Sequence, residues 1–498
     1  MHAIDLVFDG RRLWSTAVGA VHDGELHWPA ALTPHLVGST TLVVRDSADQ
    51  RILATLEVAF DASRTRVDPR DAVGRPLAMN KWNRLGPVFE GGDSGLRDRL
   101  LQHAAKIVDI AETAGYTLYI VGGSLLGYRR SGGLMPHDDD IDFAFLSDHS
   151  DPGDIALDGY RLERVLREAG QAVVRHSLTH LEVDAFDEHG HVEHYVDIFT
   201  GYFRDGLYCQ PFALRGPEVG RDDLVPVQRV EVDGVLLPAP ARPDAWLEYA
   251  YGPDWPIPDP SFTFVTNQWT SRRFENSFGV FNRGRVFWEK KWLARDGAAT
   301  PVDDPVELGR FLDSIPDGAH VLDLGCGSGA ATNEIARAGH PVLGVDYSHE
   351  ALAIAAAGAA PGARFAYLNL NDRHEALALG AQLLATGEIW FVRMADVLHG
   401  ISRTNRHNVF HLLELVLRGG ATAIGTVPTD LPRSYRHGDP TTWHYPDEWF
   451  VEEIAVHDLS LEFGDRRRLL TKDGPRDVRQ FSIRSDRIDG RTVAGGTA

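Results

Sequence analysis

Aspartates crowded into one short stretch are the residues of this chain best suited to chemistry. The stretch Asp138-Asp-Asp-Ile-Asp holds four carboxylates in five positions and runs into an apolar segment. Side chains alternate between the two faces of a strand, so Asp140 and Asp142 would share one face. Carboxylates that close repel each other unless a cation lies between them, and Mg²⁺ prefers such oxygen ligands. The pattern predicts a metal site that also receives substrate phosphates.

A third carboxylate, Asp197, stands alone in the apolar stretch Tyr195-Val-Asp-Ile-Phe, after a predicted hairpin turn at Asp187-Glu-His-Gly. Burying an unpaired carboxylate is costly, so this position predicts a metal or a cationic partner. The turn Gly122-Gly-Ser follows a predicted buried strand, and its amides and hydroxyl suit phosphate oxygens. The alternative is a solvated, helix-capping turn, but the ordered succession of all three motifs favours a site.

A second kind of chemistry is indicated by Val321-Leu-Asp-Leu-Gly-Cys-Gly-Ser-Gly, which separates a predicted strand from a predicted helix. Its glycines permit a tight turn and the close approach of the backbone to a ligand. Asp346 ends the next predicted strand, where a carboxylate can accept hydrogen bonds from ribose hydroxyls. A glycine-rich turn alone also fits a dinucleotide, but the acid Asp323, two residues before the first glycine, is unlike most dinucleotide sites.

The elements that must position these residues predict a multidomain α/β chain. Residues 1–85 alternate apolar and polar side chains between turn signals, which predicts a small domain of antiparallel strands. Residues 86–265 read as a mixed α+β domain, with a helix over 96–114 and a buried strand over 116–121. Four prolines over 253–260 indicate a linker or docking loop. Strands and helices alternate over 275–488, which predicts a parallel, doubly wound, Rossmann-like sheet.

Composition narrows the class of protein further. The 498 residues suggest roughly three domains. A net charge of −21 argues against a nucleic-acid-binding protein. Two cysteines cannot form a disulfide framework, and the N-terminus lacks the features of a signal peptide. The sequence has no uncharged apolar stretch long enough to predict a membrane span, so we expect a cytoplasmic protein.

The upstream motifs resemble a known family. Gly122-Gly-Ser-Leu-Leu-Gly-Tyr-Arg, Pro136-His-Asp-Asp-Asp-Ile-Asp and Val196-Asp-Ile-Phe resemble the motifs of the LicD and fukutin-related family over residues 90–260. The resemblance implies a nucleotidyltransferase-like fold and the transfer of phosphocholine or a phospho-alditol from a CDP-activated donor to a glycan or teichoic acid. His137 stands where the family usually has tryptophan, which leaves the choice of donor open.

The same resemblance implies roles for individual residues. Asp140, Asp142 and Asp197 would be the catalytic carboxylates that hold Mg²⁺, with Asp138 as a further metal ligand. The residues implied to bind the donor phosphates are Gly122, Gly123, Ser124 and Arg129. A bound metal would neutralise the donor pyrophosphate and stabilise the leaving CMP. One of the carboxylates would take the proton of the acceptor hydroxyl, and the sequence does not say which.

The downstream glycine motif, with its acid before the first glycine, resembles the class I methyltransferases that use S-adenosylmethionine, over residues 280–485. The resemblance implies that Asp323 helps to position the methionine amino group and that Asp346 binds the ribose. Asn371 or Asp372, after the third predicted strand, would contact the adenine. The implied cofactor-binding residues are Asp323, Gly325, Gly327, Gly329, Asp346, Asn371 and Asp372.

The methyl-accepting side is less defined by sequence. The predicted strand 388–399 ends near the substrate edge, where Arg393 and His399 would lie, although an ordinary structural role is the alternative for both. A general base helps only if the acceptor is a hydroxyl, and His399, His437 and His444 are the candidates. The stretch Phe287-Trp-Glu-Lys-Lys-Trp resembles an entry segment of such methyltransferases, and we expect it to pack rather than to contact the cofactor.

Together the motifs predict a bifunctional transferase of cell-surface polymer synthesis that uses Mg²⁺ and S-adenosylmethionine. Its expected partners are a CDP-activated donor and a glycan or teichoic-acid-like acceptor, with no nucleic acid. We expect it at the inner face of the membrane, in peripheral association with membrane-bound polymer machinery. Two alternatives remain: a methyltransferase whose central domain only binds glycan, or a central domain that transfers the nucleotide itself.

Overall fold

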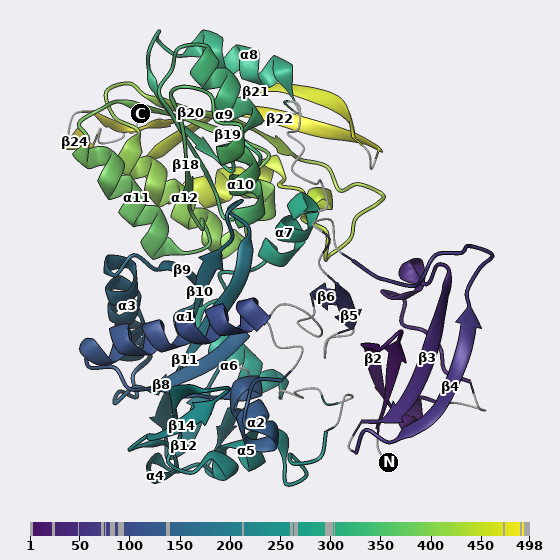
Figure 1. Ribbon diagram of the computed structural model, residues 1–498. Helices are drawn as coiled ribbons and strands as arrows, with labels where there is room; N and C mark the ends of the chain where they lie inside the picture. The colour runs from purple at the N-terminus through teal and green to yellow at the C-terminus, as the bar shows by residue number, and fades with distance from the viewer. Residues whose placement is uncertain are drawn as a thin grey trace. The chain divides into compact units, whose positions relative to one another are not determined.

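The computed structural model describes residues 3–21, 25–47, 49–70, 74, 76–79, 85–87, 94–135, 140–211, 214–258, 262, 267–293, 302, 304–471, 474–488 and 491–492 (Figure 1). It divides into two compact units. The first comprises Met1–Phe186 and Glu193–Gly279, and the second comprises Asp187–Val192 and Val280–Ala498.

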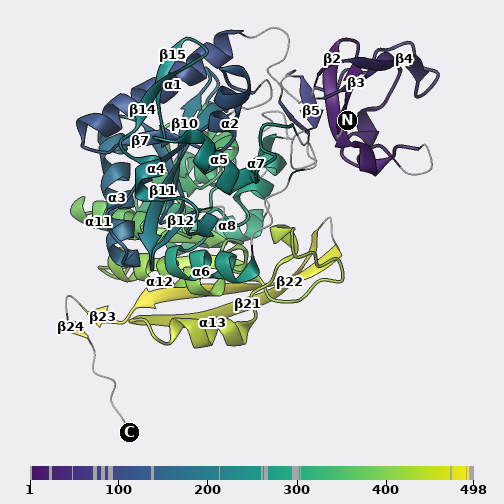
Figure 2. The ribbon, with the colours of Figure 1, turned by 90° about the horizontal axis from the view of Figure 1, so that it is seen from below.

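The N-terminal part of the first unit is an antiparallel sheet with the strand order β2-β1-β3-β4 (Figure 2). Its strands are β1 Ala3–Phe8, β2 Arg11–Ala17, β3 Ser39–Asp46 and β4 Ile52–Ala59, followed by the short pair β5 Leu77–Met79 and β6 Leu85–Pro87. Leu6, Phe8, Leu13 and Trp14 form its buried core. The predicted antiparallel β fold of this region is confirmed by the antiparallel pairing of all four strands.

The rest of the first unit is a mixed sheet covered by helices. Its elements are α1 Ser94–Thr113, β7 Leu118–Ile120, α2 Gly122–Ser131, β8 Asp140–Leu146, α3 Pro152–Glu168, β9 Ala172–Ser177, β10 His180–Phe186, β11 Val192–Arg204, β12 Leu207–Gln210, β13 Leu214–Gly216, α4 Arg221–Leu224, β14 Gln228–Val232, β15 Val235–Ala239, α5 Pro243–Tyr251 and α6 Gln268–Phe278. The long strand β11 pairs with β10 on one side and with β8 on the other.

Two sequence patterns explain the layers around β11. The helix predicted over 96–114 is α1, and its apolar positions Leu100, Leu101, Ala104 and Ile107 are at most 2% exposed. In β8, Ile141 and Phe143 are fully buried on one face, whereas Asp140 and Asp142, which alternate with them, lie on the other. The core is therefore on one side of β8, and the opposite face is left for polar side chains.

The second unit is built on a sheet with the strand order β18-β17-β16-β19-β20-β22-β21. Its elements are α7 Arg285–Leu293, α8 Pro305–Ser314, β16 His320–Leu324, α9 Ala330–Arg337, β17 Val342–Asp346, α10 His349–Ala357, β18 Ala363–Tyr367, α11 Arg373–Ala385, β19 Trp390–Ala395, α12 Arg403–Val416, β20 Thr422–Pro428, α13 Asp447–Ile454, β21 Leu459–Thr471 and β22 Gly474–Ser485, with the small pair β23 Arg487–Ile488 and β24 Arg491–Thr492.

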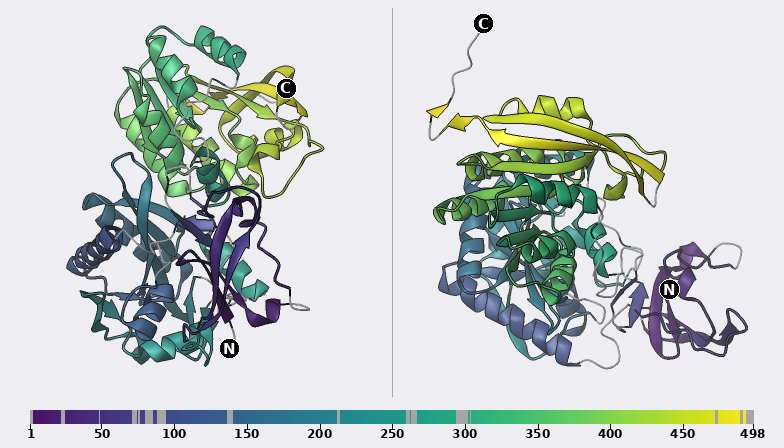
Figure 3. Two further views of the ribbon diagram at one scale, coloured as in Figure 1. Left: turned by 45° about the vertical axis from the view of Figure 1, so that its right-hand side comes forward. Right: turned by 90° about the horizontal axis from the view of Figure 1, so that it is seen from above.

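The predicted parallel sheet is confirmed for β16 to β20, which are joined by helical crossovers. The last two strands differ, because β22 runs antiparallel to both β20 and β21 (Figure 3). β21 ends at Thr471 and β22 begins at Gly474, and strands separated by so short a connection can pair only in an antiparallel arrangement. The strand order reverses at β16, so a crevice opens at the carboxyl ends of β16 and β19.

Within the part of the chain that the structure describes, the helices fall short of the length and apolarity that a membrane crossing requires.

Candidate functional sites

The carboxylate triad of the first unit is assembled by two parallel strands. In the register of β8 and β11, Asp142 lies opposite Asp197, and Asp140 lies opposite Tyr195. One carboxylate oxygen from each of Asp140, Asp142 and Asp197 lies within 4.8 Å of the other two. The face of β8 predicted from sequence is therefore the face that carries the triad. Three hard oxygen donors at this spacing fit the preferences of Mg²⁺.

The start of helix α2 holds Asp142 in place. The Gly123 amide donates a hydrogen bond to Asp142 Oδ2 at 3.1 Å, and the Asp142 amide donates one to Ser124 Oγ at 2.9 Å. Gly122 has a φ of +57°, and a Cβ there would lie 2.3 Å from Asp142 Oδ2. Glycine at this position thus permits both the turn into the helix and the close approach of the carboxylate.

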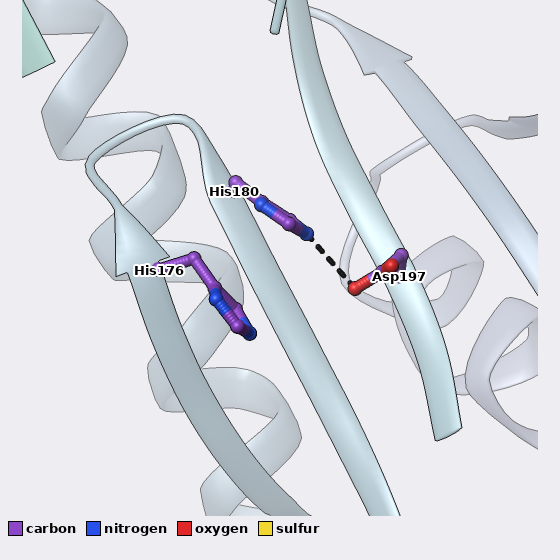
Figure 4. A group of neighbouring side chains, drawn as sticks. All are labelled: His176, His180 and Asp197. Carbon is purple, nitrogen blue, oxygen red and sulfur yellow. Dashed lines mark hydrogen bonds and ion pairs between the residues drawn. The ribbon is translucent and has the colours of Figure 1, made fainter. Parts of the chain in front are cut away.

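Asp197 is the most deeply buried carboxylate of the triad, and it is 8% exposed. Its carboxylate lies 2.8 Å from Nε2 of His180 on β10 (Figure 4). Burial raises the pKa of Asp197 well above its usual value, and the charges of Glu182, Asp140 and Asp184 raise it further. Burial lowers the pKa of His180 to about 4, so its imidazole is neutral at physiological pH. The carboxylates gathered around Asp197 favour a bound cation, because a cation would offset their mutual repulsion.

A cavity of ≈ 230 Å³ lies in the second unit at the carboxyl ends of its parallel strands. Gly325, Cys326, Gly327 and Ser328 of the glycine-rich turn form one wall. Other lining residues are Trp288, Lys291, Trp292, Asp346, Tyr347, Leu370, Asn371, Arg393, Asp396 and Thr426. Its position at the reversal of strand order is where doubly wound sheets bind nucleotide-like ligands.

The glycine-rich turn approaches its neighbours closely. Gly325 has a φ of +68°, and a Cβ there would lie 2.5 Å from Val397 Cγ2. The Gly327 amide donates a hydrogen bond to Asp346 Oδ2 at 3.0 Å, so the turn and the end of β17 are tied together. Burial raises the pKa of Asp346 to about 6, against the opposing effect of its backbone hydrogen bonds.

Helix α7 closes one side of the cavity. Glu289 accepts hydrogen bonds from Ser348 Oγ at 2.6 Å and from the His349 amide at 2.9 Å, at the N-terminus of α10. This contact satisfies amides that lack a partner within the helix. Trp288 and Trp292 then line the cavity. Two rings of the aromatic stretch therefore line the cavity, and whether the stretch only packs or also contacts the cofactor stays a prediction.

The comparisons with known proteins agree with these two sites. Residues 115–242 match the family model described as the LicD/FKTN/FKRP nucleotidyltransferase domain, and residues 321–420 match a methyltransferase domain model. The chain joins a LicD/FKTN/FKRP nucleotidyltransferase domain to a C-terminal SAM-dependent methyltransferase domain. The methyltransferase domain implies the use of S-adenosylmethionine. A comparison with curated proteins gives no match.

Solved structures similar to this chain include several methyltransferases. One is a SAM-dependent methyltransferase from Anabaena variabilis, with 19% identity over 41% of this chain and 94% of that chain and a TM-score of 0.33. Another is magnesium protoporphyrin IX methyltransferase from Synechocystis, with 16% identity over 40% and 95% and a TM-score of 0.29. A SAM-dependent methyltransferase from Methanosarcina mazei has 19% identity over 36% and 97% and a TM-score of 0.28.

The residues expected to bind the cofactor fall into two groups, those that line the cavity and those that do not. Gly325, Gly327, Asp346 and Asn371 line the cavity. Asp323, Gly329 and Asp372 are not among the lining residues within the described part of the chain. Asp372 instead caps helix α11, where it accepts a hydrogen bond from the His374 amide at 2.8 Å. Of the two adenine candidates, the geometry therefore favours Asn371, and the contact itself stays a prediction.

Asp323 has other partners in the structure. Its side chain is fully buried, and its two oxygens accept hydrogen bonds from Thr332 Oγ1 at 2.6 Å and from Arg393 Nη1 at 3.0 Å. Arg393 also pairs with the buried carboxylate of Glu307 at 2.6 Å. The guanidinium expected at the substrate edge is thus held by two carboxylates within the domain. Of the two roles considered for Arg393, the structural one is the better supported.

The histidines proposed as bases of methyl transfer lie outside the cavity lining that the structure describes. Burial lowers the pKa of His399 to about 3, with help from the positive charge of Arg476. A base with so low a pKa is a weak proton acceptor at neutral pH. His437 stacks on Trp443, and His444 packs at a tilt against Trp449. Their role in catalysis stays a prediction.

In the LicD domain, one predicted metal ligand falls outside the described residues, and three residues predicted at the donor phosphates have other partners. Asp138, together with the neighbouring His137, lies outside the described residues. Arg129, expected at the donor phosphates, pairs with Asp244 of helix α5 through Nε at 2.6 Å and Nη2 at 2.9 Å. Gly123 and Ser124, also expected at the phosphates, hold Asp142. Their phosphate contacts therefore stay proposals.

Three residues near the two sites were missed by sequence reasoning. Asp396 lines the cavity directly after β19, with a strained φ of +55°, and the signal was an acid at the end of the fourth strand. His176 and His180 lie beside Asp197, and the signal was a His-x-x-x-His spacing around a tight turn. A spacing that short is common by chance, so only the fold gives it meaning.

Proposed function

We propose that the chain is a bifunctional transferase of cell-surface polymer synthesis. The LicD domain transfers a phospho-group, of the phosphocholine or phospho-alditol type, from a CDP-activated donor to a glycan or teichoic-acid-type acceptor with Mg²⁺. The methyltransferase domain methylates that product or the polymer from S-adenosylmethionine. The observation that carries the proposal is the triad of Asp140, Asp142 and Asp197, gathered within 4.8 Å on two parallel strands.

The residues of the LicD domain supply orientation and charge. Asp140, Asp142 and Asp197 would hold Mg²⁺, and the amide of Gly123 fixes the rotation of Asp142. A bound metal ion supplies charge neutralisation at the pyrophosphate and at the leaving CMP. A triad carboxylate not fully engaged with the metal accepts the proton of the attacking hydroxyl. The cluster of carboxylates around Asp197 strengthens the binding of a cation because it adds negative charge at short range.

The methyltransferase cavity fits an adenosyl cofactor. Asp346 ends β17 with a carboxylate that accepts hydrogen bonds from ribose hydroxyls, and Asn371 offers an amide for the adenine. The sulfonium of the cofactor is already activated, so the protein has mainly to align it with the acceptor. Trp288 and Trp292 line one side of the cavity and offer it two aromatic rings. Asp396 stands at the carboxyl end of β19, on the side where an acceptor enters.

The two activities would act on one polymer. The fusion of both domains in one chain is the motivation, since fusion keeps the product of one site near the other. The enzyme would then work at the inner face of the membrane, in association with the machinery that builds the polymer. Methylation of an unrelated small molecule, with every product of the LicD domain refused, would contradict this coupling.

The first experiment measures CMP release. The purified full chain is incubated with Mg²⁺, a panel of CDP-linked donors and a teichoic-acid-like acceptor. We expect release with at least one donor, and its loss in Asp140→Asn and Asp197→Asn. Asp148→Asn is the matched control, because the Asp148 side chain is 76% exposed and pairs with Arg221 at the surface. Chemical denaturation followed by circular dichroism, measured in parallel, verifies that the LicD domain of each variant is folded.

The outcomes separate the candidate functions. Release that persists in both triad variants would contradict the proposal. No release with any donor, alongside tight S-adenosylmethionine binding, favours a methyltransferase with a glycan-binding central domain. The mass added to the acceptor decides the third case, because a nucleotidyl group and a phospho-alditol differ in mass. Transfer of a radioactive methyl group to the LicD product then tests the coupling of the two domains.

A further inference from the structure

Two histidines stand beside the triad without a role in the chemistry described so far. His176 lies near the end of β9 and His180 opens β10, so the tight turn between these strands brings the two rings together. The rings are stacked, with centroids 4.5 Å apart and an interplanar angle of 19°. Figure 4 shows both side chains and Asp197 gathered over neighbouring strands of the sheet.

These three side chains present ligand atoms at metal-binding distances. One atom from each of His176, His180 and Asp197 lies within 4.8 Å of the other two. The side chains are 12%, 14% and 11% exposed, respectively, so the site is largely shielded from solvent. A fourth donor is at hand, because Glu182 Oε2 lies 3.0 Å from His176 Nε2. Histidines and carboxylates in a partly buried pocket are the ligands that bind Zn²⁺, Mn²⁺ or Co²⁺.

Asp197 belongs to both groups of ligands. The strand order places β11, with Asp197, between β8, with Asp140 and Asp142, and β10, with His180. A carboxylate has two oxygens and can bridge two ions, which in two-metal sites lie about 3.5–4 Å apart. Imidazole nitrogens on one side and hard oxygens on the other would make the two positions chemically different.

We propose that His176, His180 and Asp197 form a second divalent-cation site, selective for a transition metal ion, that shares Asp197 with the Mg²⁺ site of the triad. Glu182 lies close enough to complete its ligand set. The site goes beyond the proposed function, which needs a single hard cation and makes no use of either histidine. It also does not depend on which group the LicD domain transfers.

The competing role for His180 is to orient Asp197 by a hydrogen bond. That role would need one histidine, and it gives no reason for a second ring stacked on the first with its Nε2 turned to Glu182. A metal site uses both rings and both carboxylates. The two roles differ in an observable, because only the metal site binds a transition metal ion when Mg²⁺ is in excess.

The experiment titrates Co²⁺ into the full chain after chelator treatment, in excess Mg²⁺. Bound cobalt is counted by elemental mass spectrometry, and the visible absorption of Co²⁺ reports imidazole coordination. We expect one equivalent of tightly bound Co²⁺ per chain. His176→Gln and His180→Gln are expected to weaken Co²⁺ binding by about 100-fold or more, since each removes a ligand.

Matched variants define the site. His189→Gln is the control for the substitution, because the His189 side chain is 72% exposed and belongs to the hairpin turn that follows β10. Asp142→Asn should keep Co²⁺ and weaken Mg²⁺, whereas Asp197→Asn should weaken both. Chemical denaturation followed by circular dichroism, measured for every variant, shows whether the LicD domain remains folded.

Two results would overturn the proposal: a wild-type chain that takes up no Co²⁺ in excess Mg²⁺, or histidine variants that bind Co²⁺ as tightly as the wild type. Either would leave His180 as an orienting donor to Asp197. The readout counts bound metal and needs no donor substrate. A wild-type chain that binds Co²⁺ but releases no CMP from any donor would therefore contradict the proposed function alone.

Discussion

Arg393 on β19 lies directly opposite Asp323 on β16, and its guanidinium donates to that carboxylate at 3.0 Å. The same guanidinium pairs with Glu307 at 2.6 Å, and both carboxylate side chains are fully buried. A buried ion triad therefore lies near the end of β16, and Asp323 belongs to it two residues before the first glycine of the turn. Asp346 lines the cavity instead.

Replacing Arg393 with methionine should destabilise the methyltransferase domain. Glu307 and Asp323 would then be buried without their cationic partner, which typically costs about 3–5 kcal/mol of unfolding free energy. Chemical denaturation of the full chain, with and without S-adenosylmethionine, identifies the transition of this domain. Arg337→Met is the control, because Arg337 and its partner Glu334 have side chains that are 56% and 48% exposed. Equal stability of the two variants would show that the buried triad adds nothing.

S-adenosylmethionine binding should weaken in acid through Asp346. Burial raises the pKa of Asp346 to about 6, so its carboxyl is protonated in the empty site below that pH. Ribose hydroxyls donate to the carboxylate form, so the cofactor competes with the proton. The Kd measured by calorimetry should rise about tenfold for each pH unit below 6 and stay level above it.

Two variants test whether Asp346 causes the rise of the cofactor Kd below pH 6. Asp346→Asn should bind the cofactor weakly at every pH and lose the dependence near pH 6. Asp372→Asn should keep both the affinity and the pH dependence, because Asp372 caps helix α11 and lies outside the described cavity lining. If the Kd of Asp346→Asn still rises below pH 6, the proton binds to another group.

Gly122→Ala should disable the LicD site without affecting the methyltransferase domain. The new Cβ would lie 2.3 Å from Asp142 Oδ2, so the carboxylate must leave its position. Gly132→Ala is the matched control at the other end of α2, with a φ of +78° and no atom within 4 Å of the new Cβ. Both substitutions carry a backbone cost of about 1 kcal/mol, but only Gly122→Ala displaces a metal ligand. Mg²⁺ binding measured by calorimetry should weaken in Gly122→Ala alone, and equal binding in both variants would contradict the assigned role of Asp142.

Substitutions at Arg129 and Asp244 test whether the Arg129 guanidinium leaves Asp244 to bind the donor phosphates. If Arg129 contacts the donor phosphates, Arg129→Gln should raise the donor KM by about tenfold or more, since a charge-assisted hydrogen bond is lost. Asp244→Asn removes the partner that holds Arg129 at 2.6 Å, and should leave the KM unchanged or lower it. CMP release at varied donor concentration gives both values. An unchanged KM in Arg129→Gln would confine Arg129 to its ion pair with Asp244.

The sequence by itself determined the two domain types and most of the residues that could bind ligands. Local patterns suffice for this: alternation places Asp140 and Asp142 on one face of β8, and the acid at the end of β17 is Asp346. Strand type and helix spacing depend on side chains a few residues apart, so a linear reading recovers them. The match of both family models agrees with that reading.

Only the tertiary structure decided which candidates meet. The parallel register of β8 and β11 brings Asp197 opposite Asp142, and the pairing of β10 beside them adds His180. The structure likewise shows that Asp323 and Arg393 form a buried ion pair. It also shows that Asp372 caps helix α11, whereas Asn371 lines the cavity. Such contacts depend on strand order and register between distant segments, which are fixed by the packing of the whole sheet rather than by any local pattern.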